Sequence, residues 1–125
     1  MNQKIDTRNA PAAIGPYSQA VAADEFVFVS GQLPIDPATG DFPSDDIAEQ
    51  TRQSLTNLKA ILETAGCSLS DVVKTTVYLA DIQDFGSMNA VYGTFFTGTC
   101  PARAAFAVAG LPKNARVEIE AIAHR

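Results

Sequence analysis

Hydrophobic positions with helical spacing run through the middle of the chain. The residues that would share one face, three or four positions apart, are Ile47, Thr51, Leu55, Leu58, Leu62 and Ala65. Ser44 can cap the start of such a helix, and Asp45 and Asp46 suit the positive end of its dipole. Gly66 stands where a left-handed residue ends a helix. The pattern predicts one amphipathic helix between Ser44 and Gly66.

A second apolar stripe predicts a shorter helix over about residues 82–96. Its members are Phe85, Met88, Val91, Tyr92, Phe95 and Phe96. The pair Thr97-Gly98 then breaks the pattern, and the helix is expected to end there.

Alternating and β-branched segments predict strands around these helices, at about residues 19–22, 26–30, 71–81, 102–110 and 116–123. Residues 104–109 are small and apolar, which predicts a buried strand. The last segment alternates, with one face formed by Val117, Ile119, Ala121 and Ala123 and the other by Arg116, Glu118, Glu120 and Ile122. Two loops rich in proline and glycine are expected at residues 9–19 and 32–46.

Together these elements predict an α+β fold with five or six strands, mostly antiparallel, and two helices that cover one face of the sheet. The segment Phe26–Val29 is nevertheless apolar on both faces. A chain of this length has no further element to cover the second face, so we expect a homo-oligomer in which sheets or sheet edges meet.

The composition narrows the class of protein. A length of 125 residues predicts a single domain, residues 1–125, with one core. The net charge of -5 and the scattered basic residues argue against a nucleic-acid partner. Residues 1–7 hold no apolar signal stretch and no run is long enough for a membrane helix, so we expect a cytoplasmic protein with no membrane partner. Cys67 and Cys100 lack metal-ligand spacing and are expected to be free thiols.

Common catalytic signatures are missing from the sequence, including a glycine-rich phosphate loop, a metal cluster and a nucleophile elbow. The single histidine, His124, stands beside the C-terminus and is expected to be solvated. An enzyme built on this chain would have to work with carboxylates, tyrosine, hydroxyls, arginine and bound water.

Arg103 stands out because its permanent charge precedes the apolar run 104–109. Burying an unpaired charge costs several kcal/mol, so this guanidinium needs an anion. It could pair with a carboxylate of the protein, such as Glu120, or it could clamp a carboxylate or phosphate of a ligand in bidentate geometry. The residues alone leave both interpretations open.

Several long blocks resemble the RidA family, also called the YjgF family. In order along the chain they are NAPAAIGPYSQAV, VFVSGQLPIDPATG, VVKTTVYLADIQDF, MNAVYGTFF and PARAAFAVAGLPKNARVEIEAIA. The resemblance covers nearly the whole chain. It implies a chorismate-mutase-like α+β fold and a homotrimer with three active sites in the clefts between subunits.

The same resemblance implies a reaction that uses no cofactor. Members of the RidA family hydrolyse 2-aminoacrylate, or its tautomer 2-iminopropionate, to pyruvate and ammonia. They also hydrolyse the threonine-derived 2-aminocrotonate, or 2-iminobutanoate, to 2-oxobutanoate. These enamines and imines escape from pyridoxal-phosphate enzymes that dehydrate serine or threonine. An imine carbon is already electrophilic, so its hydrolysis needs only orientation, a water molecule and proton transfers.

By matching motif, the resemblance assigns the catalytic roles to three residues. Arg103 of the PAR block would bind the substrate carboxylate, Glu120 would position or activate water, and Tyr17 would close the cleft or assist proton transfer. The other residues expected to contact substrate are Ser30, Gly31, Asn89 and Ala105. Many relatives carry cysteine where this chain has Ala105, so only a backbone role is expected there.

Two other functions remain as alternatives. The same pocket could bind a 2-keto acid without catalysis, because such a module would use Arg103 in the same way. RNA cleavage or translation inhibition is also attributed to some relatives, although the acidic chain lacks a basic stripe with interleaved aromatic residues.

Overall fold

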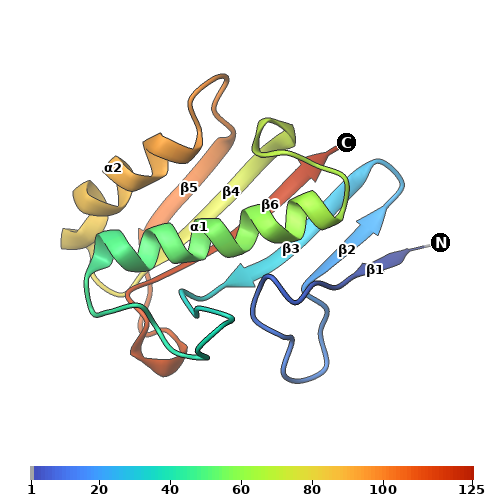
Figure 1. The fold of residues 1–125 in the computed structure, drawn as a ribbon. Helices are drawn as coiled ribbons and strands as arrows, with labels where there is room; N and C mark the ends of the chain where they lie inside the picture. The colour runs from blue at the N-terminus through green and yellow to red at the C-terminus, as the bar shows by residue number, and fades with distance from the viewer. Residues whose placement is uncertain (1) are drawn as a thin grey trace.

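The computed structural model describes residues 2–125, which form one six-stranded sheet and two helices (Figure 1). The strands are β1 (Gln3–Ile5), β2 (Ala20–Ala23), β3 (Phe26–Gln32), β4 (Val72–Leu79), β5 (Ala102–Ala107) and β6 (Val117–His124). The helices are α1 (Ile47–Thr64) and α2 (Phe85–Phe95). In the sheet the strands follow the order β1-β2-β3-β6-β4-β5, and β4 and β5 are the parallel pair in an otherwise antiparallel sheet. The predicted fold class is confirmed.

Both helices cover the same face of the sheet (Figure 1). The alternation predicted for β6 is confirmed, since Val117, Ile119, Ala121 and Ala123 are all buried against the helix layer. Leu55, Leu58 and Leu62 of α1 are fully buried in the same core. The period of two on the strand and the helical period on α1 therefore meet in one apolar layer.

The start of α1 differs from the prediction. Asp46, not Ser44, is the N-cap, and its carboxylate accepts a hydrogen bond from the Glu49 backbone N–H at 3.0 Å. Ser44 instead donates to the Glu49 side chain and accepts from the Asp46 N–H. The end is as predicted, because Gly66 follows the helix with a φ of +82°.

The prediction of a buried strand over residues 104–109 is wrong for the single chain. Strand β5 is the edge of the sheet, and none of its residues is fully buried. Within residues 2–125 its one strand neighbour is β4, so half of its backbone hydrogen-bonding groups point away from the sheet. The apolar composition of this segment is therefore not explained by the core of one chain.

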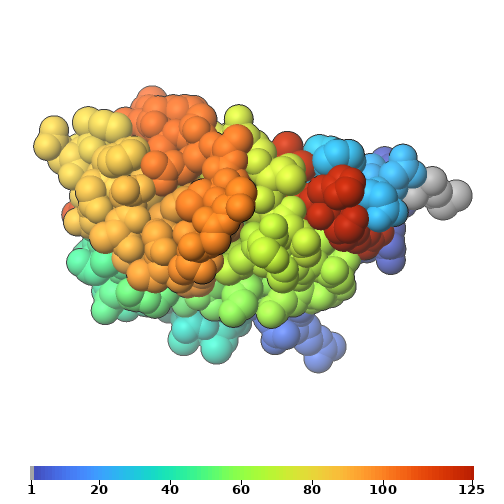
Figure 2. Space-filling model, turned by 90° about the horizontal axis from the view of Figure 1, so that it is seen from above, coloured from blue at the N-terminus to red at the C-terminus, as the bar shows by residue number. Residues whose placement is uncertain are grey.

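The face of the sheet opposite the helices, the open face, carries large apolar side chains. Phe28 of β3 is 46% exposed and Phe106 of β5 is 45% exposed. Phe106 packs edge-on against Tyr78 of β4, with ring centroids 5.6 Å apart. At one end of the sheet the C-terminal residues lie beside the β2–β3 turn, where the Arg125 N–H donates to the Glu25 carbonyl at 2.8 Å (Figure 2). The second face is uncovered in the single chain, as the FVFV segment predicted.

The structure also describes the two cysteines and the length of the helices. Cys67 and Cys100 are both free thiols. Within residues 2–125, no helix has the length and apolarity needed to cross a membrane.

Candidate functional site

Arg103 is held at the sheet edge by residues of α2. Its Nη1 donates to Oδ1 of Asn89 at 2.7 Å, and the guanidinium lies over the rings of Tyr92 and Phe85, at 4.7 Å and 5.5 Å from their centroids. Arginine binds such ring faces through its charge and its planar shape. These contacts hold the guanidinium in place, although Arg103 as a whole stays exposed.

The ring of Tyr92 is itself held in place by strand β4 of the sheet. Its hydroxyl shares a buried hydrogen bond of 2.7 Å with Oγ1 of Thr75 on β4. Burial raises the pKa of the Tyr92 phenol, and the Thr75 hydrogen bond and the Arg103 charge offset this only in part. The phenol therefore stays neutral at physiological pH and serves as a rigid platform for the guanidinium.

Arg103 has no carboxylate partner among residues 2–125, where the ion pair formed is Arg116 with Asp84 at 3.3 Å. Ala105, two residues along β5, is half-buried and packs against the core on the same side of the strand. We call Asn89, Arg103 and Ala105, with the two aromatic rings, the arginine half of the site.

Tyr17 stands at the end of a folded loop between β1 and β2. Gly15 turns this loop with a φ of +118°, and the Tyr17 N–H donates to the Gly15 carbonyl at 2.9 Å. The Tyr17 hydroxyl accepts from the Ile14 N–H at 3.4 Å. The ring remains 53% exposed, so it can contact a ligand or a second chain.

Ser30 and Gly31 lie at an irregularity in the pairing of β3 with β6, between Val29 and Gln32. The Ser30 hydroxyl donates to the Ser18 carbonyl at 2.6 Å, which ties β3 to the residue after Tyr17. Ser30 thus uses its proton within the chain, which leaves lone pairs of its oxygen able to accept a further hydrogen bond. Tyr17, Ser30 and Gly31 form the tyrosine half of the site.

Gly31 leaves room for the side chain of Glu118 on β6. A Cβ atom at Gly31 would overlap the Glu118 carboxylate and lie 2.9 Å from its Cδ. Burial, and then the charge of Glu120, raise the pKa of Glu118. Any larger residue at position 31 would displace this carboxylate.

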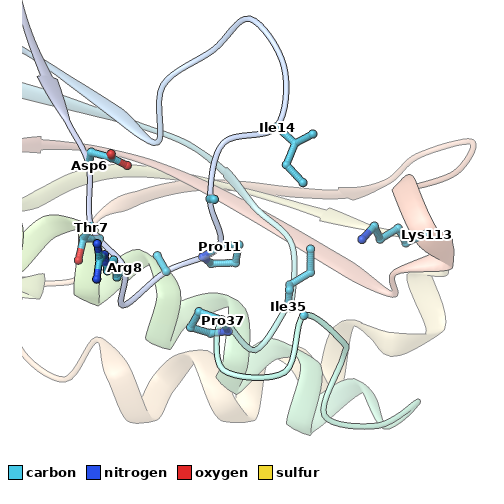
Figure 3. Close-up of a pocket in the computed structure, with 11 residues that line it drawn as sticks. Asp6, Thr7, Arg8, Pro11, Ile14, Ile35, Pro37 and Lys113 are labelled. Carbon is cyan, nitrogen blue, oxygen red and sulfur yellow. The ribbon is translucent and has the colours of Figure 1, made fainter.

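Tyr17 and Gly31 line a hollow of about 230 Å³. A larger hollow of about 590 Å³ lies next to it, between the loop that carries Asp6–Ile14 and the loop that carries Ile35–Gly40 (Figure 3). The two hollows share a wall formed by Pro11, Ala12, Ile14, Ile35 and Lys113. The loop before Tyr17 is thus the partition between them.

Glu120 lies on the open face, on β6. It lines a shallow hollow of about 250 Å³ with Lys74, Thr76 and Ile122. Burial raises the pKa of the neighbouring Tyr78 phenol, and Glu120 and Glu118 raise it further.

The structure places Arg103 and Glu120 on opposite faces of the sheet. Arg103 pairs with Thr75 of β4, whose side chain is buried on the helix side, and Glu120 pairs with the next residue, Thr76. Successive side chains of a strand point to opposite faces, so a direct pair between Arg103 and Glu120 in one chain is ruled out. The predicted residues therefore gather as two halves, and Glu120 stands on the strand between them.

Sequence reasoning missed three contributors to these halves. Phe85 and Tyr92 were assigned to an apolar helix stripe, and that stripe gave no sign that two of its rings lie beneath a guanidinium. Glu118 was placed on the same face of the last strand as Glu120, but the alternation gave no sign that its carboxylate lies against Gly31. Groups of three or more side chains suited to a metal ion do not occur within residues 2–125.

Comparisons with known proteins find close relatives over the whole chain. The family model described as Endoribonuclease L-PSP matches residues 7–125. The 2-iminobutanoate/2-iminopropanoate deaminase of Rattus norvegicus is 56% identical over 119 residues, which is 95% of this chain and 87% of the rat protein.

Solved structures give the same picture. The YjgF gene product of Escherichia coli has a TM-score of 0.95 at 52% identity, covering 98% of both chains. Escherichia coli TdcF with bound serine has a TM-score of 0.95 at 48% identity, again covering 98% of both chains.

Proposed function

Since this chain belongs to the RidA (YjgF) family, whose model is described as Endoribonuclease L-PSP, we propose that it is a deaminase of 2-imino acids and their enamine tautomers. The substrates would be 2-iminopropionate and 2-iminobutanoate, and the products pyruvate or 2-oxobutanoate with ammonia. The observation that carries the proposal is the Arg103 guanidinium, which Asn89 and two rings hold in place and which pairs with no carboxylate among residues 2–125.

The two halves act together in the proposed site. Arg103 binds the substrate carboxylate, Asn89 holds the guanidinium, and the backbone of Ala105 lines the pocket. Ser30 and Gly31 contact the other side of the substrate, and Tyr17 closes over it.

Glu120 handles the protons of the reaction. As the water oxygen bonds to C2, Glu120 accepts a proton from the water and passes it to the imine nitrogen, which gives a tetrahedral carbinolamine and returns Glu120 to its ionised form. A second transfer moves the hydroxyl proton to nitrogen. The C–N bond then breaks, ammonia leaves and the keto acid remains. General acid–base catalysis of this kind supplies about 100-fold to 10,000-fold in rate.

We further propose that residues 1–125 act as one domain in a homotrimer, with each site assembled between two chains. The separation of Arg103 from Glu120 by the sheet and the exposed apolar side chains of the open face support this assembly. In the cell such a trimer would remove reactive enamines before they damage the pyridoxal-phosphate enzymes that release them.

The test generates 2-aminoacrylate with a serine dehydratase and follows pyruvate formation with catalytic amounts of the chain. We expect acceleration over the spontaneous reaction, and Glu120→Gln should reduce it about 100-fold. The matched control is Glu63→Gln, which removes an exposed carboxylate on α1.

Other outcomes of this assay point elsewhere. Saturable binding of pyruvate without any acceleration would replace the deaminase by a 2-keto acid binding module. Because the family is described as Endoribonuclease L-PSP, RNA is the other substrate to test. Cleavage of single-stranded RNA that stays with the protein through further purification would favour that activity, against the expectation from a net charge of -5.

A further inference from the structure

Gln19 is a buried amide placed between the loop that carries Tyr17 and the start of β2. Its side chain is only 1% exposed. Its Oε1 accepts from the Thr7 N–H at 2.8 Å, and its Nε2 has three carbonyl acceptors: Thr7 at 3.0 Å, Ala10 at 3.3 Å and Pro11 at 2.7 Å. One side chain therefore satisfies backbone groups at both ends of the segment 7–11.

This segment depends on Gln19 because it has no strand partner. Residues 7–19 lie between β1 and β2 and form no helix or strand. Buried backbone carbonyls and N–H groups need hydrogen-bond partners, and in this segment a side chain takes the place of a neighbouring strand. Replacing Gln19 by an apolar residue would leave these groups unpaired.

We call the hydrogen bonds of the Gln19 amide to Thr7, Ala10 and Pro11 the clamp. The clamp is connected to the tyrosine half of the site in two ways. Pro11, whose carbonyl forms the shortest bond to Gln19, belongs to the wall shared by the two hollows (Figure 3). The Gln19 backbone carbonyl also accepts from the Ser30 N–H at 2.9 Å. Gln19 thus connects the partition before Tyr17 to β3 at Ser30, the residue before Gly31, which lines the smaller hollow.

The opposite wall has its own buried amide. Asn57 of α1 is fully buried, and its Nδ2 donates to the carbonyls of Leu33 at 3.1 Å and Ile35 at 2.8 Å. That wall is thereby tied to a long helix, whereas the Tyr17 loop is tied to the rest of the chain by Gln19. Within residues 2–125 the Tyr17 loop has no helix behind it, and apart from the Ser30–Ser18 hydrogen bond at its end its position depends on the Gln19 amide.

We propose that Gln19 is a positioning residue of the site, which holds the loop before Tyr17 in the conformation that receives substrate. This inference rests on the proposed deaminase function. Without the clamp, only a fraction of molecules has the competent loop at any moment, and binding of substrate must select them. The apparent KM then rises by the inverse of that fraction, while kcat at saturation changes little.

Gln50 provides a matched control for the test. It is also a glutamine with 1% exposure, and its amide joins the Ser44 carbonyl at 2.9 Å to the Arg116 N–H at 2.8 Å. These backbone groups lie outside both hollows. Gln19→Met and Gln50→Met therefore each remove one buried side-chain amide. The first removes it next to the hollows, and the second removes it away from them.

The experiment measures hydrogen exchange by mass spectrometry and steady-state kinetics on both variants. We expect faster exchange in peptides covering residues 7–17 in Gln19→Met alone, together with a KM raised about 10-fold and kcat within about threefold of wild type. Gln50→Met should match wild type in both KM and residue 7–17 exchange, even if both variants melt earlier.

Three results would overturn parts of this inference separately. Unchanged exchange over residues 7–17 in Gln19→Met would remove the clamp itself. Faster exchange with unchanged KM would remove its role in positioning. Absence of turnover in the wild-type chain would defeat the proposed function and the kinetic half of the inference, while the exchange comparison would still decide the clamp.

Discussion

The arginine half and the tyrosine half of the site are built by different means. Arg103 projects from a regular strand and lies on two aromatic rings, one of which is fixed by a buried hydrogen bond to Thr75. Tyr17 stands on an irregular loop whose conformation depends on a glycine turn and on the amide of Gln19. The first half is rigid because elements of the core support it, and the second is held by hydrogen bonds within a loop.

We propose that this difference separates binding of the substrate carboxylate by Arg103 from closure of the site by Tyr17. A guanidinium that must meet a small carboxylate gains from a rigid platform, because little entropy is lost when the ligand binds. A loop that must admit substrate and then exclude water has to keep some freedom of movement. The strands β3 and β5, which carry parts of the two halves, are separated by β6 and β4, so we propose that the halves meet through assembly of chains.

The largest effect is expected from a charge on the open face. Phe28→Asp places a carboxylate among exposed apolar side chains that we expect to be buried in the trimer. The trimer should dissociate at micromolar concentration and activity should fall to background, as checked by sedimentation velocity and the pyruvate assay. Ile82→Asp, at a residue that is 50% exposed outside the sheet, should stay trimeric. A fully active Phe28→Asp monomer would show that one chain holds a complete site.

The next effect concerns the rigid half. Arg103→Ala should lower kcat/KM about 100-fold to 1,000-fold, since truncating one partner of a desolvated charge pair costs about 2–5 kcal/mol. Arg103→Lys should recover only part of this, because an ammonium keeps the charge but loses the planar fork. The unfolding temperature of the isolated chain should change little in Arg103→Ala, because Arg103 is exposed in the single chain.

Arg52→Ala, which removes an exposed arginine of α1, is the control for the loss of one positive charge. An Arg103→Lys variant with wild-type kinetics would mean that charge alone anchors the substrate. The platform of Phe85 and Tyr92 would then have no catalytic purpose.

A smaller effect is expected beside Gly31, in the tyrosine half. Burial and the charge of Glu120 raise the pKa of Glu118 in the folded chain, so the folded state binds more protons than the unfolded state around that pKa. The stability associated with protonated Glu118 is present at low pH and is lost as the pH rises through the folded pKa.

Glu118→Gln removes the cost of ionising this partly buried carboxyl. The substitution should therefore raise the unfolding temperature at pH 7 by a few degrees at most, and by less at pH 4. Thermal unfolding followed by circular dichroism at the two pH values measures the difference. A gain that is equal at both pH values would assign the effect to packing against Gly31 and not to ionisation.

The elements that form the core could be predicted from the sequence, because their period is a local property. The stripes of α1 and α2 and the alternation of β6 each specify which side chains face inward, and the structure confirms them. Strand β1 has three residues, which is too short for a recognisable period. The edge position of β5 depends on long-range pairing, which no local pattern contains.

The site was predictable as a set of residue types but not as an arrangement. The family motifs named Arg103, Glu120 and Tyr17, yet the pairing of β5 and β6 with adjacent residues of β4 decides that the first two face opposite ways. Gln19 escaped notice because a glutamine inside a loop motif looks like any other polar loop residue. Its importance comes from the carbonyls that the fold places around it.

The central claim is that each site takes its two halves from different chains, and mixed trimers test it most directly. Arg103→Ala and Tyr17→Ala chains are combined one to one by refolding, and pyruvate formation is compared with that of each parent. If one chain supplies the arginine half and its neighbour the tyrosine half, about a quarter of the sites are intact and about a quarter of wild-type activity returns. A mixture no more active than the average of its parents would contradict the account, because it would place both halves in the same chain.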